Sequence, residues 1–123
     1  MKNNPVVWFE IYVQEMERAK QFYESVFQVK LERLNTPDLE MWGFPMDMNS
    51  AGASGALVKM AGVPSGGVST LIYFACDDCA VEEARIDESG GQIKQAKMSI
   101  GEYGFISLGF DTEGNLFGLH SMQ

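Results

Sequence analysis

The sequence predicts an α+β protein built from two tandem βαβββ modules. Three observations predict it: a strand-type alternation before an amphipathic helix, a strand-then-helix pattern that restarts near Leu71, and a Gly/Pro-rich stretch between them. We expect module 1 to span residues 1–60, a linker to span 61–68, and module 2 to span 69–123. The 123 residues are a common size for one compact domain, so we expect a single domain.

The first strand is predicted from Val6 to Val13, because its residues alternate between two faces. These faces carry Phe9, Ile11 and Val13 on one side and Trp8, Glu10 and Tyr12 on the other. The first set is apolar and suits a helix-covered core. The second set is large and polar-tipped, which suits the wall of a pocket.

A helix is predicted from Glu15 to Phe27, where apolar residues recur at helical spacing. Three short strands should follow, near residues 30–34, 39–46 and 56–60. A Gly/Ser/Ala loop is expected from Asn49 to Gly55. These elements complete module 1.

Module 2 is predicted to repeat this order. An apolar strand spans Leu71–Ala75, and a helix begins at Asp77 or Asp78, either of which would cap its first turn. The helix should end at Gly90, and strands are expected near residues 92–96, 103–110 and 115–121. Residues 24–30 and 88–94 match in the two halves, as do the patterns at 55–58 and 117–120. Two matches in the same order support an internal repeat.

The composition of the chain argues against several classes of function. The net charge is −8 with no basic run, which argues against binding to nucleic acid or to an anionic membrane surface. No stretch approaches the ~20 apolar residues that a membrane span needs. The start, Met-Lys-Asn-Asn-Pro, has no apolar signal core, so we expect a cytoplasmic protein. Two cysteines do not make a disulfide scaffold.

Three stretches resemble the vicinal-oxygen-chelate superfamily, which includes glyoxalase I, bleomycin-resistance proteins and extradiol dioxygenases. They are Trp-Phe-Glu-Ile-Tyr-Val at residues 8–13, Glu-Met-Glu-Arg-Ala at 15–19 leading to Phe22-Tyr23, and Asp-Thr-Glu-Gly-Asn-Leu-Phe-Gly-Leu-His-Ser at 111–121. The resemblance implies a glyoxalase-like fold. In that fold, two modules form curled mixed sheets around a cleft, with the helices outside and frequent pairing into homodimers.

The resemblance also implies four metal-ligand positions, on the first and fourth strands of each module. They fall on Trp8, Ala56, Leu71 and Gly118, and none of these side chains binds a metal ion. We therefore expect no metal site and no cofactor. A two-residue slip would bring Glu10 and His120 to two of the positions, which is still fewer than the three protein ligands of a typical catalytic zinc site.

Glu10 and His120 are the candidate catalytic or orienting residues. Burial beside aromatic rings would raise the pKa of Glu10, as suits an acid or base near neutrality, but pairing with a neighbouring Lys, Arg or Tyr is the alternative. His120 is the only histidine, and a structural role is the alternative for it. The aromatic residues expected to bind a ligand are Trp8, Tyr12, Trp42, Tyr73 and Tyr103, whereas Phe44 is expected in the core.

Cys76 and Cys79 have the spacing of a thioredoxin-like motif at the start of a helix. The aspartates between them would raise a thiol pKa, and Cys76 shares a face with Ile72 and Phe74 that should be core. No further cysteine completes a zinc site. We therefore expect buried, unreactive thiols.

These features favour a metal-free protein that binds a small molecule in an aromatic cleft, with Glu10 and His120 fixing its orientation. The acidic balance favours a neutral or cationic ligand. One alternative is a lyase, isomerase or dioxygenase, either metal-dependent or using Glu10 as base. The other is a partner-binding or regulatory subunit.

Overall fold

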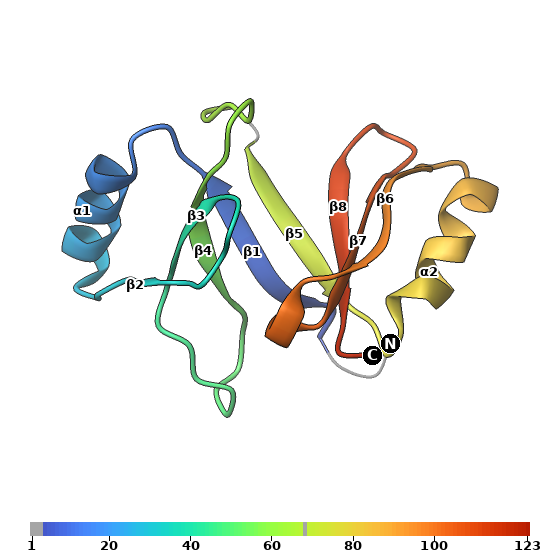
Figure 1. Ribbon diagram of the computed structural model, residues 1–123, viewed down its shortest axis with the longest axis horizontal. Helices are drawn as coiled ribbons and strands as arrows, with labels where there is room; N and C mark the ends of the chain where they lie inside the picture. Colours follow the sequence, from blue (N-terminus) through green and yellow to red (C-terminus); the bar gives the residue numbers. More distant parts are fainter. Residues whose placement is uncertain (1–3, 68) are drawn as a thin grey trace. The chain divides into compact units, whose positions relative to one another are not determined.

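The computed structural model describes residues 4–67 and 69–123, which fold into eight β-strands and two α-helices (Figure 1). They form two compact units. The N-terminal unit consists of residues 8–70, and the C-terminal unit consists of residues 71–123 together with residues 4–7. Residues 1–3 of the predicted module 1 and residue 68 of the predicted linker lie outside the described residues.

The N-terminal unit has a mixed four-stranded sheet with the strand order β2-β3-β4-β1. Its elements are β1 (Val6–Tyr12), α1 (Met16–Phe27), β2 (Glu32–Arg33), β3 (Glu40–Gly43) and β4 (Ser54–Lys59). Strand β4 runs parallel to β1, and the other two pairings are antiparallel. This is the βαβββ order that the sequence predicts.

Helix α1 covers one face of this sheet. Its buried residue Met16 packs with Val13, Leu31 and Leu57 in the core of the unit. The helix ends at Gln28, which adopts the left-handed conformation (φ 54°) and donates its backbone N–H to the Glu24 carbonyl. The chain therefore turns back sharply and enters the short strand β2.

The C-terminal unit repeats this arrangement with the strand order β5-β8-β7-β6. Its elements are β5 (Thr70–Ala75), α2 (Cys79–Ile86), β6 (Gln92–Ser99), β7 (Phe105–Phe110) and β8 (Leu116–Ser121). Strand β8 is parallel to β5, and β7 is antiparallel to both β6 and β8. The predicted α+β fold, with each helix outside its own mixed sheet, is confirmed.

Helix α2 begins as the sequence predicts. The Asp78 carboxylate accepts a 3.0 Å hydrogen bond from the backbone N–H of Ala80, and Lys97 Nζ lies 2.7 Å from the same carboxylate. Cys79 and Ile86 of α2 pack against Leu119 of β8. The helix therefore covers the β8 face that carries Leu119.

Several predicted boundaries are wrong. Strand β3 ends at Gly43 rather than near residue 46, β6 continues to Ser99 rather than ending near residue 96, and α2 ends at Ile86. Strand β7 begins at Phe105 rather than at Tyr103, because Gly101–Tyr103 forms a short 3-10 turn. Gly101 (φ 73°) and Gly104 (φ 103°) hold this turn in left-handed backbone conformations that favour glycine. No helix among the described residues is long and apolar enough to cross a membrane.

Candidate functional site

Strand β1 presents the residues of the candidate site on the sheet face opposite α1. Ile11 and Val13 pack under the helix, so their alternating neighbours Trp8, Glu10 and Tyr12 point to the other side. We call this side of the N-terminal unit's sheet the Glu10 face. The predicted alternation of the strand is thus confirmed.

Glu10 lies between the two aromatic residues and accepts a hydrogen bond from each. The indole N–H of Trp8 donates to Oε2 over 3.2 Å, and the hydroxyl of Tyr12 donates to Oε1 over 2.9 Å. The side chain is buried, with 8% of its surface exposed. The carboxylate is therefore fixed in position by two side chains of its own strand.

Burial raises the pKa of Glu10 above its ordinary value, because removal from water disfavours the charged form. The hydrogen bonds from Tyr12 and Trp8 oppose this shift, since they stabilise the carboxylate. Burial and the neighbouring Glu10 charge both raise the pKa of the Tyr12 hydroxyl. Tyr12 therefore keeps its proton and acts as a donor to Glu10 at neutral pH.

The arrangement leaves Glu10 able to interact with another group. A carboxylate has about four lone-pair sites, and the two aromatic donors use only two of them. Among residues 4–67 and 69–123, no lysine or arginine lies within ion-pair distance of Glu10. The site offers a buried hydrogen-bond acceptor, or a proton acceptor, beside aromatic surface.

Trp42 lies on the other face of the same sheet. It packs against the core beneath α1, its indole N–H donates to Glu40 over 2.9 Å, and Lys20 Nζ lies 3.4 Å from the centre of its ring. The structure therefore does not bring Trp42 together with Trp8 and Tyr12. Phe44 also packs against this core, as expected.

The hydrogen-bonded pair of Glu40 and Trp42 was not predicted from the sequence. Its residues are separated by two positions, as are Trp8 and Glu10, so the spacing could have drawn attention to it. The contact with Lys20 depends on how α1 packs on the sheet. No local pattern in the sequence encodes that contact.

His120 and Tyr73 lie in the C-terminal unit, on the sheet face opposite α2. Leu119 packs under α2, so His120 points to the other side, and Tyr73 is paired with Gly118 on that side. His120 Nε2 lies 2.6 Å from the backbone carbonyl oxygen of Tyr103. Because a carbonyl oxygen only accepts, Nε2 carries the hydrogen and Nδ1 is the open acceptor of the neutral ring.

Tyr103 contacts His120 through its backbone carbonyl, which lies in the Gly101–Tyr103 turn. The Tyr103 side chain is exposed. Tyr73 is buried. The ligand-binding role predicted for Tyr73, Tyr103 and Trp42 stays a prediction, as does the catalytic role of Glu10 and His120.

At the four metal-ligand positions implied by the resemblance, the residues contact other parts of the protein. Ala56 and Leu71 are buried, and the Trp8 indole is bonded to Glu10. A Cβ atom at Gly118 would lie only 2.3 Å from the Tyr73 ring, so the ring occupies the space of a side chain there. Among the residues that the structure describes, no three His, Cys, Asp or Glu side chains gather as metal ligands. These positions do not fit the family's metal ion.

The two cysteines belong to the packing around α2. Cys79 is completely buried, and Cys76 packs against the same core. Burial raises the pKa of Cys76 to about 11, and the neighbouring Glu82 carboxylate adds to the shift. A thiol with such a pKa is mostly protonated at neutral pH and reacts slowly.

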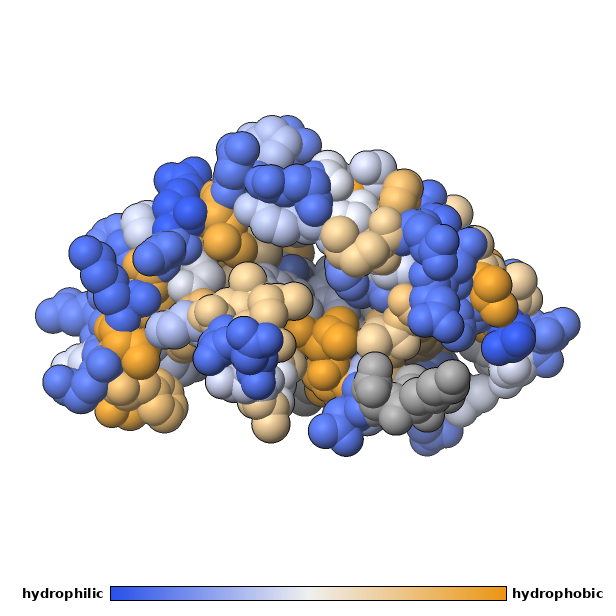
Figure 2. Space-filling view, turned by 90° about the horizontal axis from the view of Figure 1, so that it is seen from below, coloured by the Kyte–Doolittle hydropathy of each residue, from blue (hydrophilic) through white to orange (hydrophobic). Residues whose placement is uncertain are grey.

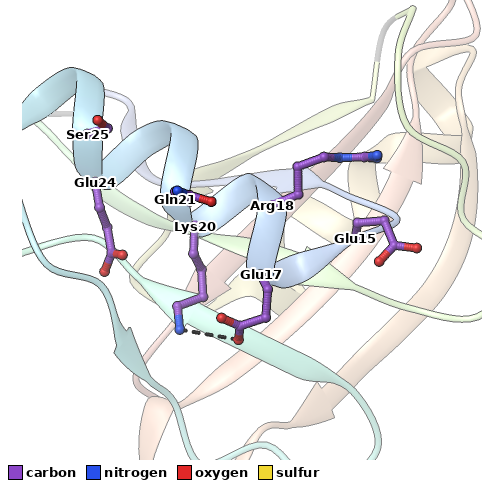
Figure 3. A pocket seen from close by; sticks show the side chains of 7 residues that line it. All are labelled: Glu15, Glu17, Arg18, Lys20, Gln21, Glu24 and Ser25. Carbon is purple, nitrogen blue, oxygen red and sulfur yellow. Dashed lines mark ion pairs between the residues drawn. The ribbon is translucent and has the colours of Figure 1, made fainter.

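A hollow of about 770 Å³ lies along α1, and Glu10 is not among the residues that line it. Its lining is Glu15, Glu17, Arg18, Lys20, Gln21, Glu24 and Ser25. Figure 3 shows these side chains projecting from α1 and from Glu15 just before it, with Lys20 Nζ 3.6 Å from the Glu17 carboxylate. A hollow bounded only by side chains of α1 and of Glu15 lacks the convergent walls of a binding site. We therefore assign the candidate site to the Glu10 face.

The rest of the surface carries both hydrophilic and apolar side chains. In Figure 2, hydrophilic side chains (blue) cover much of the visible face, and apolar side chains (orange) emerge in separate groups. Phe22, Val26 and Phe27 of α1 are among the exposed apolar residues. These three residues lie together on α1, and an exposed apolar group of this size identifies no site by itself.

The chain matches a known protein family. A family model described as Glyoxalase/Bleomycin resistance protein/Dioxygenase superfamily matches residues 6–119. Among curated proteins, none matches the sequence.

Solved structures share the fold. A variant of methylmalonyl-CoA epimerase from Streptomyces coelicolor, in complex with 2-nitronate-propionyl-CoA, is 12% identical, covers 96% of each chain and has a TM-score of 0.73. A hypothetical protein from Bacillus halodurans is 12% identical, with 99% of this chain and 96% of that chain covered and a TM-score of 0.75. A glyoxalase/bleomycin resistance protein/dioxygenase superfamily member from Vibrio splendidus is 19% identical, with 96% and 99% covered and a TM-score of 0.66. At these identities the similarity establishes the fold.

Proposed function

Because the chain belongs to the glyoxalase/bleomycin resistance protein/dioxygenase superfamily, we propose that it binds a small molecule on the Glu10 face, with Glu10 as the polar anchor. One observation carries the proposal. Glu10 is a buried carboxylate that Trp8 and Tyr12 hold in place while two of its lone-pair sites remain open. Apolar aromatic surface around a few fixed polar groups is typical of small-molecule sites.

The two tryptophans provide the test, since they lie on opposite faces of one sheet and no other tryptophan is present. Trp42→Phe leaves Trp8 as the only indole reporter, and Trp8→Phe leaves Trp42. We expect hits from a small-molecule screen to change the fluorescence of the Trp8 reporter and to leave the Trp42 reporter unchanged. Hits that act only on the Trp42 reporter would contradict the proposal.

A second candidate is proton transfer, with Glu10 as base in an isomerase-type reaction. The raised pKa of Glu10 favours it, because a base works best when its pKa lies near the operating pH. The methylmalonyl-CoA epimerases among the solved structures make carbonyl compounds a reasonable class to test first. Exchange of the hydrogen next to a thioester carbonyl for deuterium, followed by NMR, should depend on Glu10. Equal exchange with Glu10→Gln would exclude this role.

We also propose an oligomeric state, a metal content, a location and a module organisation for the chain. We propose a metal-free homodimer in the cytoplasm, organised as modules 1–60 and 69–123 around the linker 61–68. Light scattering after size-exclusion chromatography tests the dimer, and elemental analysis of protein purified without chelators tests the absence of metal. A monomer, or a stoichiometric metal, would overturn the corresponding part.

A further inference from the structure

The Glu10 carboxylate has hydrogen-bond donors but no cation among the described residues. Its two partners, the Trp8 indole and the Tyr12 hydroxyl, are neutral groups. The ion pairs within residues 4–67 and 69–123 are Lys20–Glu17 and Lys97–Asp78, and neither involves Glu10. A buried carboxylate without an opposite charge is unfavourable, because the two neutral donors replace only part of its lost hydration.

The hydrogen-bonded pair of Glu40 and Trp42, on the other face of the sheet, differs from the pair of Glu10 and Trp8 in having a cation nearby. Glu40 also accepts from a tryptophan two residues away, but Lys20 lies over that ring, 3.4 Å from its centre. The chain itself thus supplies a cation beside the Glu40–Trp42 pair. Beside the Glu10–Trp8 pair, the described residues supply none.

We propose that the ligand of the Glu10 face is an organic cation, a protonated amine on an apolar body, whose ammonium group pairs with Glu10. This inference rests on the proposed function, since it names the ligand class for the same site. The ammonium would donate to the carboxylate lone pairs that Trp8 and Tyr12 leave open. Its apolar body would lie along the aromatic surface of these residues, and aromatic rings attract cations.

The charge balance of the chain favours the same class. The formal net charge is −8, so a cation is attracted and an anion is repelled at long range. That attraction alone would not select a place on the surface. Glu10 supplies the place, because its carboxylate is fixed by two partners and needs little reorganisation on binding.

Three probes of one shape and different charge test the inference: benzylamine, benzyl alcohol and benzoate at neutral pH. Binding to the 123-residue chain is followed by the chemical shifts of the β1 backbone amides. We expect benzylamine to bind at least about tenfold more tightly than benzyl alcohol, the ratio that a charge-assisted hydrogen bond supports, and benzoate to bind more weakly than either.

Glu10→Gln and Glu40→Gln form a matched pair of variants, because each removes one negative charge and so changes the net charge of the chain equally. We expect Glu10→Gln to abolish the preference for benzylamine and Glu40→Gln to retain it. Equal loss in both variants would mean that only the overall charge matters, which overturns the inference. If Glu10→Gln does not fold, the ranking of the three probes on the wild-type chain decides.

The outcomes separate the two proposals. If benzyl alcohol binds at β1 as tightly as benzylamine, the small-molecule site stands and the amine inference fails. If none of the probes shifts the β1 amides, the amine inference also fails, and the proposed function then depends on the tryptophan reporters. If benzoate binds most tightly, the ligand is an anion and the inference is wrong.

Discussion

The Tyr12 hydroxyl donates a 2.9 Å hydrogen bond to Oε1 of Glu10, two residues earlier on the same strand. This bond lowers the pKa of a carboxyl group whose burial raises it. The protonation state of Glu10 therefore depends on a neighbour that the same strand supplies.

Tyr12→Phe removes this donor while keeping the ring. We expect the pKa of Glu10 to rise further, because the hydrogen bond from Tyr12 stabilises the charged carboxylate and the variant lacks it. NMR titration of the ¹³C-labelled carboxyl group measures it. Tyr103→Phe, in the other unit, is the control. An unchanged titration of Glu10 in Tyr12→Phe would show that the hydroxyl is not a donor in solution.

Stability should fall with rising pH because of Glu10. Its folded-state pKa is raised above the ordinary value of 4.5, so the folded protein keeps a proton that the unfolded chain has released. The free energy of unfolding then decreases from about pH 4.5 up to the raised pKa and is constant above it, as far as this residue is concerned.

Glu10→Gln cannot titrate, so this variant should lack that decrease. Urea unfolding of the wild type and the variant between pH 4 and pH 8 gives the comparison. Glu40→Gln controls for the change in net charge. Parallel pH profiles for the wild type and Glu10→Gln would contradict the prediction.

Gly118→Ala should destabilise the C-terminal unit. The new Cβ atom would lie 2.3 Å from Cδ1 of Tyr73, so the ring or the strand must move. Overpacking of this kind typically costs about 1–3 kcal/mol, measurable by denaturant unfolding. Tyr73→Leu should relieve the clash, so the double variant should lose less stability than the sum of the single variants. Strict additivity would contradict the contact.

The neutral ring of His120 should carry its hydrogen on Nε2, because the Tyr103 carbonyl can only accept. Nitrogen-15 chemical shifts of the ring distinguish the tautomers directly. Gly104→Ala should weaken this preference, since its Cβ atom would lie 2.4 Å from the Ser121 carbonyl oxygen. Gly114→Ala is the control: it has a similar positive φ, and its Cβ atom would meet nothing within 4 Å. A mixture of tautomers in the wild-type protein would refute the assignment.

Local patterns sufficed to predict much of the fold and the placement of Glu10. Strand β1 alternates cleanly, so the period of two places Trp8, Glu10 and Tyr12 on one face. The Asp78 cap follows from the position of a short polar side chain at the helix start. Both features depend on residues that are neighbours in the chain.

Other features depend on contacts between distant residues. Strand β3 carries large apolar residues on both faces, Met41 and Trp42, so alternation alone cannot tell which face Trp42 joins. The pairing of Trp42 with Leu57, which packs under α1, decides the face. Likewise, the turn that brings the Tyr103 carbonyl to His120 requires strand β8 to be in place.

The Tyr73 ring over Gly118 also limits how this chain can change by mutation. A single substitution at position 118 that introduced a metal-binding side chain would bring that side chain against the Tyr73 ring. A second substitution that shrinks residue 73 would have to occur first or together with it. Introduction of a metal-binding side chain at this position therefore takes at least two substitutions, and the intermediate with a cavity in place of the ring is itself less stable.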